Sequence, residues 1–319
     1  MSTIDDIVKL SGVSRSTVNR FLAGQTVRGD NARRIKSVMK ELNYRPDKLV
    51  EKRNYTIEII GGYATRNTKG FMGYSEMMMT MIKTLEQNGA TVMIQPAHEK
   101  YIPFADGVIC FGLESSREDE LIESFKLRKI PLVFAYREIM KPGVNYVTCD
   151  NYMAAYEMTE LLIKKGHTKI AVCGGEGLKR NMAEKLQGFK DCMRDYKLEI
   201  PPNFINTTNS ESVGREWFES LLDSGEEFSA VFGLRDGLSV AFCEVLKERG
   251  YKIPQDVAVV GMDGSADALY NNPKITGVTI PFAEMGKKVA ETILELLNDR
   301  ETSCLRKYLK YEISMRGSL

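Results

Sequence analysis

The stretch "SGVSRSTVNRFLAG", residues 11–24, combines a glycine turn with a short amphipathic segment. Gly12 can adopt the backbone angles that a tight turn requires. In the segment after the turn, Val18, Phe21 and Leu22 are spaced to face one side of a helix. The opposite side of that helix then carries polar side chains, namely Arg15, Ser16, Asn19 and Arg20. The stretch predicts a helix over about 14–22 with an apolar inner face and a basic outer face.

Two further helices are expected on either side of this segment. Before it, "TIDDIVKL" spaces Ile4, Ile7 and Val8 along one face, and Ser2 or Thr3 can cap its start. After it, a helix that starts beyond Asp30 buries apolar residues at i, i+3, i+4 and i+7, namely Ile35, Val38, Met39 and Leu42. Three short helices with a four-residue turn between the first two describe a helix-turn-helix. Because Arg can bond guanine and Asn can bond adenine in the major groove, the polar face predicts DNA reading.

The charge is distributed unevenly along the chain. Residues 1–53 hold twelve Lys and Arg against six Asp and Glu, a net charge of +6. The 319-residue chain as a whole carries +1, so the remainder carries −5. A basic first segment on an acidic remainder is typical of a protein whose first segment meets a polyanion.

From Thr56 onward, β-rich runs alternate with helical ones, which predicts parallel sheets covered by helices on both faces. The runs "TIEIIGG" (56–62) and "KIAVCGG" (169–175) look alike, and each opens a series of strand–helix units. We therefore expect two similar doubly wound α/β lobes, with a ligand bound beyond the carboxyl ends of their strands.

The residues of the first segment resemble the lactose-repressor (LacI/GalR) family of bacterial transcription regulators. The matching positions are Thr3, Ile4, Gly12, Val13, Ser14, Thr17, Val18, Arg20, Leu22, Gly24, Leu42, Tyr44 and Pro46. The resemblance continues through "DGVICFG", "KKGHTKIAVCGG", "IPQDVAVVGMDG" and the ending "SMRGS", and so covers about residues 2–318. It implies a periplasmic-binding-protein-like effector domain and a symmetric dimer on a pseudopalindromic double-stranded DNA operator. The domains expected are a helix-turn-helix head (1–46), a hinge (47–55) and the two-lobed effector and dimerisation domain (56–319).

The resemblance also implies roles for residues of the head and hinge. Base readers correspond to Arg15, Ser16 and Arg20, and contacts to the DNA backbone correspond to Thr3, Ser14, Thr17 and Asn19. In the hinge, the family's minor-groove leucine is replaced by Arg53, and its Ala-Arg pair by Val50 and Glu51. We expect Arg53 to enter a narrow minor groove without wedging it open, so that this protein bends its operator less. Leu49 is the alternative wedge, if the hinge pairs in a shifted register.

Candidate effector-binding residues lie where strands end. They are Tyr63, Tyr74, Tyr136, Lys179, Lys185, Asn209, Arg235, Asp236 and Asp263. Aromatic faces stack on sugar rings, while Asp and Arg bond hydroxyl groups, so a carbohydrate or related polyol is expected. Asp263 matches an effector-binding aspartate of the family, whereas Lys185, Arg235 and Ile280 replace the usual residues. The excess of cations also suits an effector with an acidic group.

Other function classes find less support. A sugar receptor that only binds ligand is the alternative function, but it would carry a signal peptide and no basic head. An enzyme is not expected, since neither a nucleophile elbow nor a metal-ligand cluster is found, and "CGGEG" (173–177) lacks the full phosphate-binding spacing. No cofactor, metal or membrane partner is predicted. The six dispersed cysteines fit reduced thiols of a bacterial cytoplasmic protein.

Overall fold

The computed structural model describes residues 3–22, 27–42, 54–61, 72–96, 105–111, 115–175, 180–299 and 304–319. The chain divides into two units, one within Met1–Asn54 and a second that begins at Tyr55. Each unit has its own apolar core, and each is described here by itself.

The first unit, the head, is a bundle of three helices. These are α1 (Ile4–Ser11), α2 (Arg15–Leu22) and α3 (Gly29–Glu41). Their shared core consists of Ile7, Val13, Val18, Ile35, Val38 and Met39. Gly12 ends α1 in the left-handed conformation, with φ of 64°, as the turn requires. The third helix begins at Gly29, before the start that the sequence predicts beyond Asp30. Asp30 therefore lies inside its first turn.

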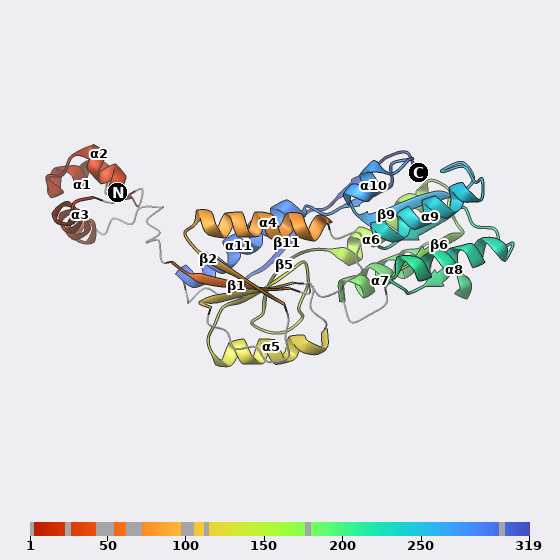
Figure 1. Ribbon diagram of the computed structural model, residues 1–319, viewed down its shortest axis with the longest axis horizontal. Helices are drawn as coiled ribbons and strands as arrows, with labels where there is room; N and C mark the ends of the chain where they lie inside the picture. Colours follow the sequence, from red (N-terminus) through yellow and green to blue (C-terminus); the bar gives the residue numbers. More distant parts are fainter. Residues whose placement is uncertain are drawn as a thin grey trace. The chain divides into compact units, whose positions relative to one another are not determined.

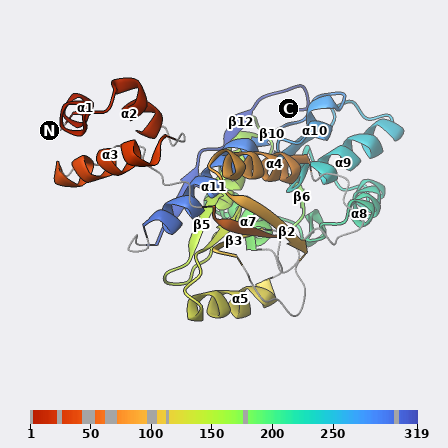
Figure 2. The ribbon, with the colours of Figure 1, turned by 60° about the vertical axis from the view of Figure 1, so that its left-hand side comes forward.

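The second unit contains two lobes (Figures 1 and 2). Lobe 1 has a parallel sheet in the order β11-β5-β4-β3-β1-β2. Its strands are β1 (Thr56–Gly61), β2 (Thr91–Pro96), β3 (Gly107–Phe111), β4 (Leu132–Ala135), β5 (Asn145–Cys149) and β11 (Arg306–Leu309). Helices α4 (Met72–Gln87) and α11 (Phe282–Asn298) pack together on one face, and α5 (Ser115–Leu127) covers the other.

Lobe 2 repeats this plan in the order β12-β10-β9-β8-β6-β7, with β12 antiparallel. Its strands are β6 (Ile170–Cys173), β7 (Ile205–Asn206), β8 (Ala230–Gly233), β9 (Ala258–Asp263), β10 (Thr276–Thr279) and β12 (Glu312–Ser314). Helices α6 (Asn151–Lys164) and α7 (Arg180–Asp195) pair on one side of this sheet. The other helices are α8 (Glu211–Asp223), α9 (Asp236–Glu248), α10 (Ala266–Tyr270) and the 3-10 turn η1 (Pro202–Phe204).

The two lobes are confirmed as similar doubly wound units, and β1 and β6 hold equivalent places in them. Neither lobe is continuous in sequence. After β10 of lobe 2 the chain returns to lobe 1 with α11 and β11, and it then adds β12 to lobe 2. The last strand ends at Ser314, so "SMRGS" contributes only its first residue to β12. Among the helices of the described ranges, none is both long and apolar enough to cross a bilayer.

Candidate nucleic-acid interface and candidate ligand site

Helix α2 presents the polar face that its sequence predicts. Val18 is fully buried against the other two helices of the head. The side chains on the outer face, Arg15, Ser16, Asn19 and Arg20, are exposed. A helix of this length with donors and acceptors along one exposed face can lie in a major groove and meet base edges.

The amino-terminal end of α2 is held by hydroxyl groups. The Ser14 Oγ lies 2.9 Å from the Thr17 Oγ1 and 3.2 Å from the Ser16 Oγ, and it accepts a 3.4 Å hydrogen bond from the Thr17 N–H. The Arg15 guanidinium forms an ion pair with Asp5 of α1. Both partners are solvent-exposed, so the pair is weak and Arg15 can exchange Asp5 for a DNA acceptor.

Thr3 has a structural role in addition to the predicted backbone contact. Its Oγ1 accepts from the Asp6 N–H at 3.3 Å, and its own N–H donates to the Asp6 Oδ2 at 2.7 Å. This reciprocal pair is a capping box at the start of α1. Arg53 of the hinge lies outside the described residues.

In the second unit, aromatic rings from lobe 1 gather at the carboxyl ends of its strands. The Tyr136 ring follows β4 and lies edge-on to Tyr74 of α4, with centroids 5.9 Å apart, and to Phe282 of α11, with centroids 5.1 Å apart. Phe111, the last residue of β3, extends the cluster through Tyr74. Gly73 makes room for it, since a Cβ there would lie 2.4 Å from the Phe282 ring.

Lobe 2 places an ion pair against these rings. The Lys185 Nζ of α7 lies 2.7 Å from the Asp263 Oδ1 at the end of β9, and it also donates to the Leu234 carbonyl at 3.2 Å. The Tyr136 hydroxyl donates to the same Asp263 Oδ1 at 3.0 Å. This hydrogen bond joins the two lobes. A second link joins Tyr74 of lobe 1 to Asn181 of α7.

Both partners of the interlobe hydrogen bond have unusual backbone angles. Tyr136 has a φ of 55° and Asp263 a φ of 103°, positive values that residues other than glycine seldom adopt. Such backbone strain persists where the surrounding structure holds it, and it gathers at ligand clamps and switches. Burial, and then the negative charge of Asp263, raise the pKa of Tyr136, so its hydroxyl stays protonated and available as a donor.

The remaining predicted residues of lobe 2 lie beside this pair. Asp236, the first residue of α9, is buried, and its Oδ2 accepts from the Ser265 N–H at 2.5 Å. Burial and the nearby Asp263 raise the pKa of Asp236 to about 7. The Arg235 Nη1 donates to the Asn209 carbonyl at 2.8 Å, and its Nη2 lies 3.9 Å from Glu211. The Asn209 side-chain oxygen accepts from the Gly175 N–H at 3.3 Å.

Each described cation of this site therefore has its own partner: Lys185 has Asp263, Arg235 has Asn209 and Glu211, and Arg137 has Glu118 at 2.6 Å. The expected surplus of positive charge also included Lys179 and Arg180, whose side chains lie outside the described part of the chain, so it stays a prediction. Tyr63 and Lys179 lie outside the described residues. No three His, Cys, Asp or Glu side chains gather to hold a metal ion within the described ranges.

Sequence reasoning missed three members of the site. Phe111 and Phe282 complete the aromatic cluster, and the Asn181 side chain forms a hydrogen bond with Tyr74. Phe111 ends a predicted strand, so the strand-end criterion could have found it. Phe282 and Asn181 lie at the start of helices, and their sequence neighbourhoods gave no comparable signal.

Comparison with known proteins matches both parts of the chain. Residues 3–47 match the bacterial regulatory proteins of the lacI family, and residues 159–319 match the periplasmic binding protein-like domain. The chain is 27% identical to the HTH-type transcriptional regulator CelR of Thermobifida fusca, over 99% of this chain and 98% of that protein. It is 25% identical to the regulator AscG of Escherichia coli, over 95% and 94%. A solved CelR–cellobiose complex is 25% identical, with a TM-score of 0.75 and all of both chains covered.

Proposed function

Because the chain belongs to the lacI family of bacterial regulatory proteins, we propose that it is a DNA-binding transcription regulator of the repressor type, controlled by a small molecule. The observation that carries the proposal is the exposed polar face of α2, set on a helix-turn-helix core in a chain with a separate two-lobed unit. It acts on a pseudopalindromic operator in the bacterial cytoplasm. The domain division 1–46, 47–55 and 56–319, and a homodimer, are parts of the same proposal.

The head reads DNA with α2 in the major groove. Arg20 and Ser16 take base edges, while Ser14, Thr17, Asn19 and Thr3 position the head on phosphates. Arg15 joins the base readers after it releases Asp5, which costs little because that pair is exposed. The basic balance of residues 1–53 supplies the salt-dependent part of the affinity.

The effector is a carbohydrate bound where the two lobes meet. The aromatic cluster offers apolar faces for a sugar ring, and Asp263, Asn209 and Arg235 offer hydroxyl partners. Since the described cations are already paired, a neutral sugar fits better than an acidic one. The solved relative that holds cellobiose is consistent with this class of ligand.

Regulation follows from the interlobe hydrogen bond. A sugar hydroxyl that binds Asp263 competes with the Tyr136 hydroxyl, which holds lobe 1 to lobe 2 at 3.0 Å. The effector therefore favours one arrangement of the lobes over another, and only such a difference in affinity can shift the equilibrium. Tyr136 and Asp263 are therefore the side chains whose contact between the lobes responds to occupancy.

A gel-shift of the purified protein on DNA upstream of its own gene, at two salt concentrations, tests the DNA-binding part. We expect specific binding that weakens steeply with salt, because Lys and Arg displace condensed counterions. Absence of any preference over random DNA would contradict the regulator and favour the alternative, a receptor that only binds sugar.

A thermal-shift screen of neutral sugars against uronates and sugar phosphates tests the ligand part. Neutral mono- and disaccharides should raise the melting temperature of wild type and have little effect on the Asp263→Asn variant. Stabilisation by the acidic sugars alone would overturn the neutral assignment and would leave the DNA-binding proposal untouched.

A further inference from the structure

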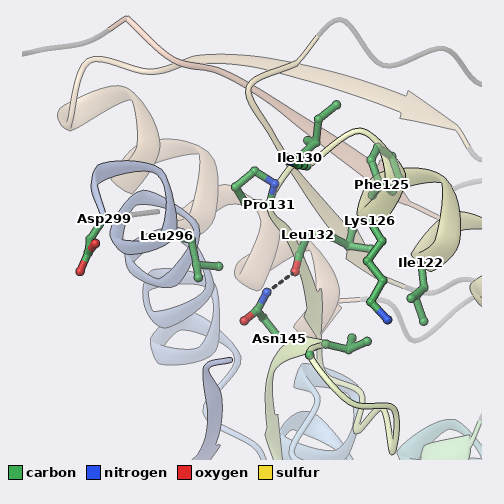
Figure 3. A pocket seen from close by; sticks show the side chains of 12 residues that line it. Ile122, Phe125, Lys126, Ile130, Pro131, Leu132, Asn145, Leu296 and Asp299 are labelled. Atoms are coloured by element: carbon green, nitrogen blue, oxygen red, sulfur yellow. Dashed lines mark hydrogen bonds between the residues drawn. The ribbon is translucent and has the colours of Figure 1, made fainter. Parts of the chain in front are cut away.

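A cavity of about 390 Å³ lies in lobe 1 (Figure 3). It lies at the amino-terminal ends of the strands, whereas the candidate ligand site lies at their carboxyl ends. Its lining includes Leu132 and Asn145, which are the first residues of β4 and β5. Tyr136 follows the other end of β4, about 13 Å away at the rise of a β-strand. This cavity, the hinge-side pocket, is therefore separate from the site between the lobes.

The walls of the hinge-side pocket are mostly apolar. Ile122 and Phe125 come from α5, Val144 precedes β5, and Leu296 comes from the last turn of α11. Figure 3 shows Phe125, Ile130, Leu132 and Leu296 around the same space. The volume lies within the range of small-molecule sites, about 300–1,000 Å³, so the pocket can bury a compact ring or branched chain.

The charged residues of the lining are two exposed lysines and one exposed aspartate, Asp299. Lys126 in the last turn of α5 and Lys129 just beyond it both line the cavity. Within the part of the chain that the structure describes, neither lysine has an ion-pair partner, whereas Asp299 on the opposite wall has an interaction of its own. The Asn145 side-chain amide also has partners within the protein. Its Nδ2 donates to the Leu132 carbonyl and its Oδ1 accepts from the Leu305 N–H, both at 2.9 Å.

We propose that the hinge-side pocket is a second small-molecule site, which binds a compact organic anion: a carboxylate carried on an aromatic or branched aliphatic body. The body is buried against Phe125, Val144 and Leu296, and the carboxylate meets Lys126 and Lys129. Apolar burial supplies the affinity, and charge-assisted hydrogen bonds from the ammonium groups select the anion over its neutral amide.

The pocket adjoins the point where the chain enters lobe 1. The Tyr55 hydroxyl donates to the Leu297 carbonyl and to the Asn298 Oδ1, both at 3.2 Å. Leu296 of the same turn of α11 lines the pocket. A ligand packed on Leu296 stiffens the turn that holds Tyr55, so the site gives the protein a second chemical input next to the hinge.

Phenylacetate and its neutral counterpart phenylacetamide are suitable probes for titration calorimetry on the full-length protein. We expect phenylacetate to bind with a Kd on the order of 1 mM, as for a ligand of this size, and phenylacetamide to bind markedly more weakly. The double variant Lys126→Ala/Lys129→Ala should weaken phenylacetate binding about tenfold and leave phenylacetamide unchanged. Val144→Phe, which fills the cavity, should remove binding of both probes.

Three controls keep the outcome decisive. Lys247→Ala/Lys252→Ala removes two exposed lysines from lobe 2 and should leave phenylacetate binding unchanged. Asp263→Asn should also leave it unchanged, because that residue belongs to the site between the lobes. Melting curves establish that each variant is folded. Equal binding of acid and amide, equal losses in both lysine pairs, or loss of binding in Asp263→Asn would each overturn the proposal.

Discussion

Arg20 lies on the exposed face of α2, one residue beyond Asn19 and away from the buried Val18. As a bidentate donor to guanine, it should contribute about 1–3 kcal/mol of discrimination at one base pair of each half-site. Arg20→Ala is therefore expected to weaken operator binding and to relax preference at that position, as fluorescence anisotropy on single-base operator variants can show. Arg33→Ala, an exposed charge on α3, serves as the control. An equal loss on every sequence would reassign Arg20 to a phosphate contact.

Lys185 is almost fully buried, with 1% of its side chain exposed, and it holds both Asp263 and the Leu234 carbonyl. Removing one partner of a buried pair leaves the other charge uncompensated, so Lys185→Met should lower the free energy of unfolding by about 2–4 kcal/mol. Lys185→Arg, which keeps a positive charge beside Asp263, should recover much of this loss.

Urea unfolding of both variants tests this expectation. Lys190→Met on the same helix is the matched control, because Lys190 is only partly buried. A loss in Lys190→Met as large as that in Lys185→Met would show that the pair with Asp263 contributes nothing specific.

Two buried carboxyl groups make stability depend on pH. Burial raises the pKa of Asp236 to about 7, with Asp263 adding to the effect, and burial raises the pKa of Glu58 to about 7. Between about pH 4 and pH 7 the folded protein keeps these protons while the unfolded chain releases them. The free energy of unfolding should therefore fall as pH rises through this range, and level off above it.

Denaturant titrations between about pH 5 and pH 8 check the sign. Asp236→Asn and Glu58→Gln should each remove part of the decline. Asp223→Asn should not, because hydrogen bonding to Arg249 lowers the pKa of Asp223 and confines its effect to more acidic solution. Stability that rises over this range in wild type would contradict the assignment.

At the scale of elements, we expect the hinge to decide how far the operator is bent. Residues 47–53 lie outside the described ranges, and only their sequence is considered. The resemblance to the family implies that Arg53 replaces a wedging leucine, and an arginine can enter a narrow minor groove without unstacking a base step. We expect a smaller operator bend than in relatives with the leucine, measured by permuted-site gel mobility. A sharp kink that Leu49→Ala abolishes would show that the hinge pairs in the shifted register.

At the scale of the whole molecule, the proposed homodimer would place two heads on one operator. Met79 of α4 is 63% exposed, whereas Met77 and Met81 of the same helix are fully buried, which fits a dimer contact on lobe 1. Met79→Glu should shift the protein towards monomer in sedimentation velocity. It should also weaken operator binding by about tenfold or more, because linked heads bind with a high effective concentration. Leu127→Glu, on the exposed α5 residue, should do neither.

Much of this architecture is local and could be predicted from the sequence. Helices α1 to α3 follow from apolar residues repeated at helical spacing, and the polar face of α2 follows from the same period once Val18 faces inward. The alternation of strands and helices predicts two parallel sheets, because a parallel connection needs a crossover helix. Residues at strand ends, such as Tyr136 and Asp263, follow from the rule that ligands bind there.

Only the tertiary structure decided how distant segments share a lobe and a site. Helix α11 returns to lobe 1 because its apolar face is buried there, and strand β11 joins the same lobe through its parallel pairing with β5, a contact between segments far apart in sequence. Phe282 joins the aromatic cluster for the same reason. Lys185 and Arg235 look like free cations in the sequence, whereas folding brings each to an acidic partner. A sequence determines which residues are charged or apolar, but burial and pairing arise when the chain closes its core, since a buried charge must find its partner there.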